Sequence, residues 1–195
     1  MKSIIILCGG RSKRMGKDKG SLIFKGKPMV SYLVDAIKEI ADEIILVLRD
    51  GEQVEEYKLI LKDYEFIKIV TDKNKDQGPL VGILTGLLDI TSEYAQILPC
   101  DSPFISKNFV LKMFKYMEMN DFDAVVPLWD DGHIEPLHSI YKKKAMPIIE
   151  NLIIDGKRDV NSLITRLNVK FVNVEELDKS KMSFLNINTI KDLEI

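Results

Sequence analysis

Stretches of continuous apolar residues alternate along this chain with stretches in which apolar residues recur every three or four positions. A continuous run is typical of a strand buried on both faces of a parallel sheet, and the spaced pattern is typical of a helix with one face on a core. The two patterns predict strands at 4–8, 43–48, 66–70, 94–98 and 123–127, and helices at 28–40, 52–61, 79–88 and 106–119.

The alternation is less regular after residue 128. An Asp-Asp-Gly turn signal between two apolar stretches predicts a hairpin within 128–141. Further elements are expected as helices at 142–155 and 160–167, a strand at 169–174 and a short helix at 189–193. Strands that alternate with helices indicate an α/β fold, with a mostly parallel sheet covered on both faces and a β-hairpin insertion. No repeat or linker divides the chain, so we expect one domain over 1–195.

Composition narrows the classes of function. The 195 residues are 46% hydrophobic and 30% charged, with a net charge of -2. This balance argues against a nucleic-acid binder that relies on overall positive charge. The apolar runs are too short to span a membrane, and the N-terminal sequence does not predict a secretory signal. Cys8 and Cys100 both end apolar runs, so we expect buried thiols in a reduced, cytoplasmic protein.

A basic, glycine-containing stretch follows the first predicted strand. Residues 7–20 read LCGGRSKRMGKDKG, and Asp18 is the one acid among seven basic residues between Arg11 and Lys27. Glycines at the carboxyl end of a buried strand let backbone N–H groups approach an anion, and the cations supply charge. The stretch matches neither the P-loop GxxxxGK[ST] nor the dinucleotide fingerprint GxGxxG. An anion-binding loop and a tight turn before a solvated basic loop therefore both remain open.

A carboxylate follows the fourth predicted strand, in ILPCDSP at residues 97–103. In a parallel sheet, Asp101 emerges at the same edge as Gly9 and Gly10. A lone carboxylate there suits Mg²⁺, which completes its shell with phosphate oxygens and water, although Asp-Ser-Pro also suits a turn or helix cap. Together with the basic loop, Asp101 favours a site for a metal–triphosphate complex.

These blocks resemble a known family. The stretch LCGGRSKRMGKDK is similar to the L-[AC]-G-G-x-S-x-R-M-G-x-D-K signature of nucleotidyltransferases related to molybdenum cofactor guanylyltransferase. The resemblance continues, in family order, through GPLVGILTGL, LPCDSPF, EPLHSIY and FLNINT. It implies a single Rossmann-like three-layer α/β/α domain that transfers GMP from GTP to molybdopterin and releases pyrophosphate, with Mg²⁺ as cofactor.

The resemblance also implies roles for individual residues. Catalytic roles, in holding the triphosphate and countering its charge, fall to Arg14, Lys19 and Asp101, with Asp101 as the metal ligand. The residues expected to bind the nucleotide are Leu7, Cys8, Gly9, Gly10, Lys19, Asp72, Pro79, Leu80, Gly82 and Asp101. The residues expected to face the pterin are Pro136, Leu137, His138, Asn186 and Asn188, although a packed position in the hairpin is equally open for His138.

Two features limit what the resemblance implies. Many relatives carry a small polar stretch with an Asn after the second strand, whereas this chain reads VLRD at 47–50. A contact to the base or ribose is then missing, or comes from Arg49 or the backbone. His133 and His138 have no third ligand nearby, so the sequence does not favour a metal site there.

Three readings of the function follow. The first is guanylyl transfer to molybdopterin, with transient contacts to cofactor-donor and molybdoenzyme-maturation proteins and without nucleic acid or membrane as partners. The second is a related nucleotidyltransferase that uses CTP or another phosphorylated acceptor. The third is a non-catalytic nucleotide-binding regulator on the same fold, against which the joint presence of Arg14, Lys19 and Asp101 argues.

Overall fold

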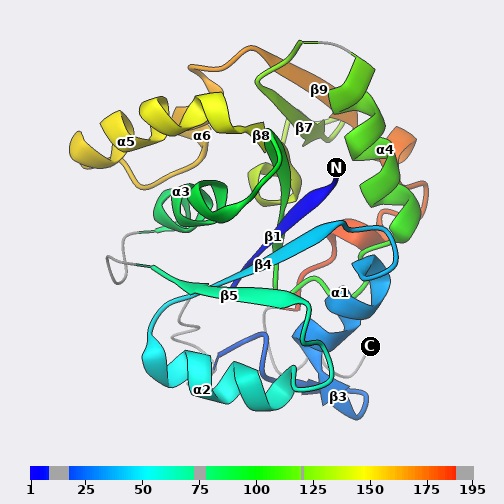
Figure 1. The fold of residues 1–195 in the computed structure, drawn as a ribbon. Coiled ribbons are helices and arrows are strands. Elements are labelled where there is room, and N and C mark those ends of the chain that lie inside the picture. The colour runs from blue at the N-terminus through cyan, green and yellow to red at the C-terminus, as the bar shows by residue number, and fades with distance from the viewer. Residues whose placement is uncertain (9–17, 73–77, 120, 188–195) are drawn as a thin grey trace.

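A seven-stranded sheet with the order β5-β4-β1-β6-β8-β7-β9 forms the centre of the molecule (Figure 1). The computed structural model describes residues 1–8, 18–72, 78–119 and 121–187. Only β8 runs antiparallel to its neighbours in this sheet. Its strands are β1 (Ser3–Leu7), β4 (Glu43–Leu48), β5 (Ile67–Thr71), β6 (Tyr94–Pro99), β7 (Ala124–Leu128), β8 (Ile140–Lys142) and β9 (Val169–Asn173).

The strand β1 lies between β4 and β6, in the parallel part of the sheet. Its side chains are apolar on both faces, which suits this buried position. Ile4, Ile5 and Ile6 are fully buried, and they face alternately two different hydrophobic clusters. The register pairs Leu7 with Val47 on one side and with Pro99 on the other. The prediction of a strand buried on both faces at 4–8 is confirmed, whereas β5, at the edge of the sheet, is partly exposed.

Helices cover both faces of the sheet and make the fold three-layered. One face packs against α1 (Met29–Ile37), α2 (Gly51–Ile60), α4 (Lys107–Met119) and α7 (Val174–Leu177). The other face packs against α3 (Pro79–Asp89), α5 (Met146–Ile154) and α6 (Asn161–Ile164), which lie together in Figure 1. The predicted α/β fold with a mostly parallel sheet is confirmed.

Two glycines, Gly82 and Gly86, allow α3 to lie close to the sheet. A Cβ atom built on Gly86 would lie 2.6 Å from Cγ2 of Ile5, which is closer than two carbon atoms can approach. A Cβ atom on Gly82 would lie 3.2 Å from Cδ2 of Leu7. Glycine at these positions therefore sets the distance between α3 and β1.

The region after residue 128 differs in part from the expectation. The hairpin turn is present, because Leu128 bridges Ile134 around Gly132, whose φ is +88°. Beyond the 3₁₀ turn Pro136–His138, β8 inserts between β6 and β7. The helix expected at 142–155 begins only at Met146, since Lys142 pairs with Tyr94 in the sheet.

Smaller differences concern short elements. The helix expected at 160–167 is the shorter α6. The pair β2 (Ile23–Phe24) and β3 (Lys27–Pro28) was not predicted, and neither was α7. The helix expected at 189–193 lies outside the described residues.

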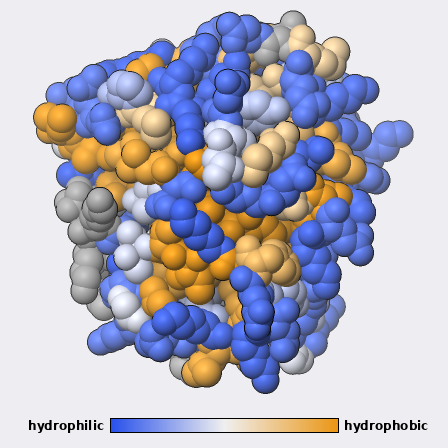
Figure 2. Space-filling model, in the orientation of Figure 1, coloured by the Kyte–Doolittle hydropathy of each residue, from blue (hydrophilic) through white to orange (hydrophobic). Residues whose placement is uncertain are grey.

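The surface is mixed in polarity. Figure 2 shows hydrophilic residues around much of one face and hydrophobic residues near its centre. Among the described helices, none combines the length and the apolar character that crossing a membrane requires.

Candidate active site

Parallel strands deliver the candidate site residues to one edge of the sheet. Cys8 follows β1, Asp72 follows β5, and Asp101 comes two positions after β6 ends. The backbone N–H of Cys100 donates to the carbonyl oxygen of Leu7 at 3.2 Å, which keeps the ends of β1 and β6 together. The carboxyl ends of such strands are where open α/β sheets bind ligands.

An ion pair joins two of the residues implicated in phosphate and metal binding. The Nζ atom of Lys19 lies 2.7 Å from Oδ2 of Asp101, although the residues are 82 positions apart in the chain. The side chains are 21% and 13% exposed, so both partners of the pair are partly accessible to solvent. The structure thus brings a cation and a carboxylate to one point at the sheet edge.

The carboxylate of Asp18 is turned inward and holds the turn that carries Lys19. Its Oδ1 accepts hydrogen bonds from the backbone N–H groups of Gly20 (3.0 Å) and Ser21 (3.3 Å) and from the hydroxyl of Tyr57. Burial raises the pKa of Asp18, and the hydrogen bonds from these three partners oppose that rise. Asp18 therefore serves as an anchor for the turn.

Gln53 connects three segments at the sheet edge. Its Nε2 donates to the carbonyl oxygen of Cys8 at 2.6 Å and also to Asp18, while its Oε1 accepts from the backbone N–H of Arg49 at 2.6 Å. Asp50 caps α2 by accepting from the backbone N–H of Gln53 at 3.0 Å. The start of α2 thereby fixes the end of β1, the Asp18 turn and the end of β4 relative to one another.

The two cysteines are buried next to this network, as expected. Cys8 is 1% exposed and Cys100 is 7% exposed, and their thiols contact each other. Burial raises the pKa of Cys8, whereas the hydrogen bond with Cys8, together with burial, raises the pKa of Cys100. Both thiols therefore stay protonated and unreactive at neutral pH.

Asp72 and Gly82 lie together on the α3 side of β1. A Cβ atom on Gly82 would lie 3.8 Å from Oδ2 of Asp72. The Oδ1 atom of Asp72 is buried and has no hydrogen-bond partner among the described residues. Burial raises the pKa of Asp72, and a hydrogen bond with Thr85 opposes the rise. Such an oxygen is suited to accept an N–H or O–H group of a ligand.

The remaining residues of this wall differ in exposure. Pro79 begins α3 and is half-buried, so it can border a ligand. Leu80 is fully buried, and its side chain belongs to the core beneath α3. Arg49 is held at the start of α2, where its Nε lies 3.0 Å from Oδ2 of Asp50.

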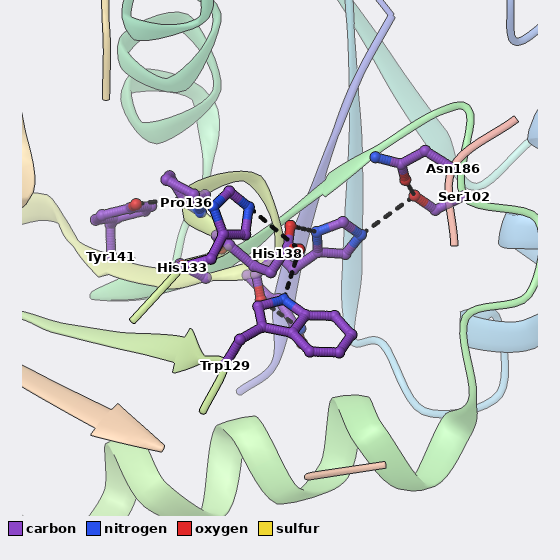
Figure 3. Close-up of polar contacts among 10 residues, drawn as sticks. Ser102, Trp129, His133, Pro136, His138, Tyr141 and Asn186 are labelled. Atoms are coloured by element: carbon purple, nitrogen blue, oxygen red, sulfur yellow. Dashed lines mark hydrogen bonds and ion pairs between the residues drawn. The ribbon is translucent and has the colours of Figure 1, made fainter. Parts of the chain in front are cut away.

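A second group of candidate residues meets on the other side of Asp101 (Figure 3). The Oγ atom of Ser102 lies 3.2 Å from Nε2 of His138 and donates to Oδ1 of Asn186. The Nδ1 atom of His138 lies 3.3 Å from Oε2 of Glu135, and Pro136 and Leu137 are half-buried beside it. The blocks EPLHSIY and FLNINT are thus in contact through Ser102.

Several candidate residues lie outside the described part of the chain, namely Gly9, Gly10, Arg14 and Asn188. Sequence reasoning also missed residues that the structure brings into the site: Asp18, Gln53, Tyr57, Ser102 and Glu135. Asp18 did carry a signal, because it is the one acid in a basic stretch. Gln53 carried none, since its partners lie on other segments.

The donor set at Asp101 fits Mg²⁺ rather than a metal bound entirely by protein. The described residues contain no group of three or more His, Cys, Asp or Glu side chains placed to hold a metal ion. Mg²⁺ keeps several waters and is usually held by one or two carboxylates together with phosphate oxygens. A single carboxylate at the sheet edge meets that requirement when a triphosphate supplies the other oxygens.

The chain is similar in sequence to known nucleotide-transferring proteins. The sequence model of the MobA-like NTP transferase domain matches residues 4–171. A probable molybdenum cofactor guanylyltransferase of Methanothermobacter thermautotrophicus is 36% identical, over 100% of this chain and 98% of that protein. Another, from Methanocaldococcus jannaschii, is 34% identical over 97% of this chain and 95% of that protein.

A solved structure is similar over the whole length. The crystal structure of molybdopterin-guanine dinucleotide biosynthesis protein A from Archaeoglobus fulgidus matches with a TM-score of 0.84 and 28% sequence identity. The match covers 100% of this chain and 95% of that one. Sequence and fold therefore agree on the same relatives.

Proposed function

The chain belongs to the MobA-like NTP transferase family, and from that premise we propose that it transfers GMP from GTP to the phosphate of molybdopterin, releasing pyrophosphate. We propose further that residues 1–195 act as one nucleotidyltransferase domain in the cytoplasm. The observation that carries the proposal is the Lys19–Asp101 pair at the carboxyl edge of the sheet. It offers both charges that a metal–triphosphate complex requires.

The reaction needs positioning and charge neutralisation more than a covalent nucleophile. A terminal phosphate oxygen of molybdopterin attacks the α-phosphorus in line, and the bond from that phosphorus to the oxygen bridging the β-phosphate breaks. Pyrophosphate leaves with the bonding electron pair. A phosphate monoester is already ionised near neutral pH, so no strong general base is needed.

Lys19 and Asp101 exchange partners when the nucleotide binds. The Lys19 ammonium, which has three N–H donors, turns from the carboxylate to the phosphate oxygens and counters their charge. Asp101 would then be available to hold Mg²⁺, which would neutralise charge on the α-phosphate and the leaving group. Arg14 adds a second cation to the triphosphate. The inward anchoring of Asp18 keeps its negative charge away from the phosphates.

The nucleoside lies on the α3 side of the same edge. The backbone at Leu7, Cys8, Gly9 and Gly10 contacts the nucleotide, and Pro79 forms the wall together with the backbone of Leu80 and Gly82. Asp72 supplies the acceptor for guanosine, because its buried Oδ1 lacks a partner among the described residues and needs an N–H or O–H donor. Guanine offers N–H donors on N1 and N2, whereas the Watson–Crick edge of cytosine offers a single amino group.

The acceptor lies on the β8 side of Asp101. Pro136, Leu137, Asn186 and Asn188 border the pterin, and His138 supports them from behind. The product would pass to molybdoenzyme-maturation proteins through transient contacts, as the substrate would arrive from a cofactor-donor protein.

The test is binding and turnover with the four nucleoside triphosphates. Titration calorimetry with GTP, CTP, UTP and ATP, each with and without Mg²⁺, is followed by assay of pyrophosphate release with molybdopterin. We expect GTP to bind tightest, to need Mg²⁺ and to support turnover. Tighter binding of CTP would move the protein to cytidylyl transfer, and binding without turnover would favour a regulator.

A further inference from the structure

Glu135, His138, Ser102 and Asn186 form a continuous chain of polar contacts across three segments of the molecule (Figure 3). We propose that this chain orients the side-chain amide of Asn186 toward the acceptor substrate, so that His138 is a positioning residue that acts through Ser102. The inference rests on the proposed function, because it assigns the donor that the phosphorylated pterin meets.

The direction of each hydrogen bond determines how Asn186 is oriented. Ser102 has one hydroxyl proton and donates it to Oδ1 of Asn186. Its Oγ must therefore accept from Nε2–H of His138, 3.2 Å away. Since Oδ1 of Asn186 is bound to Ser102, the NH₂ group is directed away from it, as the nitrogen drawn in Figure 3 shows.

Glu135 holds the other edge of the imidazole ring. Its Oε2 lies 3.3 Å from Nδ1 of His138, and its Oε1 accepts from Nε1–H of Trp129 at 2.9 Å. Burial opposes ionisation of Glu135, yet the contacts with His138 and Trp129 outweigh it and lower the pKa of this carboxyl. The Glu135 carboxylate thus lies against the Nδ1 edge of the ring and limits its rotation, which keeps Nε2 facing Ser102.

Burial excludes direct contact between His138 and a substrate. His138 is 1% exposed, and its ring packs edge-on against Phe184 with centroids 5.4 Å apart. Ser102 is fully buried. The order carboxylate, imidazole, hydroxyl is that of a serine hydrolase, but a buried Ser102 that donates its proton to Asn186 cannot act as a nucleophile.

The far end of the chain lies beside the predicted metal ligand. Ser102 directly follows Asp101, and the backbone N–H of Ile187 donates to the carbonyl oxygen of Asp101 at 2.9 Å. Asn186 is half-buried between these anchored positions. Its amide is therefore the group through which the chain can reach an acceptor oxygen or nitrogen of a substrate placed for attack near Asp101.

The experiment is a double-mutant cycle on acceptor kinetics. The wild type, His138→Phe, Asn186→Ala and the double variant are assayed with molybdopterin and GTP, and GTP affinity is measured separately. We expect His138→Phe to raise the KM for molybdopterin about tenfold, the effect of about one well-made hydrogen bond, with GTP affinity within about twofold. In the Asn186→Ala background the same change should have no further effect.

Two further variants separate positioning from a merely structural role. His138→Gln keeps an amide N–H near Ser102 and should recover most of the lost acceptor affinity. His133→Phe changes the other histidine, which is 68% exposed and lies 3.9 Å from Oε1 of Glu135, beyond hydrogen-bond distance, and it should leave the kinetics unchanged. If His138→Phe does not fold, Ser102→Ala replaces it in the cycle, since it removes one oxygen atom from the same chain.

An independent readout needs no turnover. The side-chain amide resonances of Asn186, assigned by their loss in Asn186→Ala, should shift in His138→Phe and stay in place in His133→Phe. Unchanged resonances, or additive effects in the cycle, would overturn the inference. A wild type that fails to release pyrophosphate from GTP and molybdopterin overturns the proposed function instead, and the resonances still decide whether His138 orients Asn186.

Discussion

The ammonium of Lys19 lies 2.7 Å from the carboxylate of Asp101. This pair joins the end of the basic glycine stretch to the loop after β6. Each partner can bind a ligand of the proposed reaction only when the ion pair is broken. A lysine that leaves its carboxylate can bind phosphate, and the carboxylate that it leaves can bind a cation. Before a nucleotide binds, the two side chains therefore form an ion pair with no net charge. In the proposed reaction they separate, and each binds a part of the metal–triphosphate complex.

Loss of the Asp101 charge should abolish most activity. Asp101→Asn leaves the shape of the loop but weakens Mg²⁺ binding, so we expect turnover to fall by about 100-fold or more and the Mg²⁺ requirement to rise. Pyrophosphate release measured against Mg²⁺ concentration checks this. Asp123→Asn is the control, because Asp123 also pairs with a lysine and is 17% exposed, but lies before β7. Equal losses in both variants would contradict the role of Asp101.

Replacement of Gln53 should weaken nucleotide binding in a pH-dependent way. In Gln53→Glu a carboxylate would face the carboxylate of Asp18 and the carbonyl oxygen of Cys8, which now accept from the Gln53 amide. We expect GTP affinity to fall about tenfold at pH 8 and to recover toward pH 5.5, where one proton is shared by the two carboxylates.

Gln96→Glu is the burial-matched control for this prediction. Gln96 is fully buried and donates to the carbonyl oxygen of His138, on the acceptor side. Both variants should have a lower thermal midpoint, since each buries a carboxylate. A similar loss of GTP affinity in the two variants would mean that Gln53 has no particular role in the nucleotide site.

Gly86→Ala should destabilise the fold although alanine is the better helix former. The new methyl group would meet Ile5 at 2.6 Å in the fully buried contact between α3 and β1. We expect the free energy of unfolding to fall by about 1–3 kcal/mol in urea titrations. Gly51→Ala, where nothing lies within 4 Å of the added atom, should be neutral or slightly stabilising. Equal stability of Gly86→Ala and wild type would show that α3 can move away from the sheet at no cost.

The contribution of Asp35 to stability should disappear in acid. Burial opposes ionisation, but the contacts with Lys27, Lys38 and Tyr64 lower the pKa of Asp35 from 3.8 to about 2. Because the folded-state pKa lies below the unfolded one, the charged carboxylate stabilises the fold above pH 4, and this contribution is lost as the pH falls toward 2.

Urea unfolding of Asp35→Asn at several pH values checks this. The variant should be less stable than wild type at pH 6, by less than about 1 kcal/mol because the ion pairs are partly exposed and screened. The difference should narrow as the pH approaches 2 and should shrink in high salt. A difference that is independent of pH would contradict the assignment.

The parallel core was predictable because a strand buried on both faces requires a continuous run of apolar residues, which is visible in the sequence. The run at 43–48 was placed at the bounds observed for β4. Lys142 was wrongly placed in a helix, because its pairing with Tyr94 depends on a strand almost fifty positions earlier. The spacing of apolar residues near Lys142 does not reveal a pairing with a strand so distant in the sequence.

In the candidate site too, residues within motifs were predictable from the sequence, whereas residues defined by long-range contacts were not. Motif spacing brought attention to Lys19 and Asp101, and the structure joins them. For His138 a contact with the pterin and a packed position in the hairpin were both open, and its side chain is 1% exposed, behind Ser102. Gln53 was invisible to sequence reasoning because its role consists of hydrogen bonds to Cys8 and Asp18, which no periodicity or motif encodes.

The hydrogen bond from Ile187 to Asp101 has a consequence for how the protein is made. Ribosomes add about 5–20 residues per second, so the residues around Asp101 are synthesised several seconds before the segment that binds them. A nascent chain that has just exposed β6 holds the parts of the nucleotide side and lacks the acceptor side. Premature termination after α4 would therefore leave a fragment that contains Lys19 and Asp101 but none of the residues proposed to border the pterin.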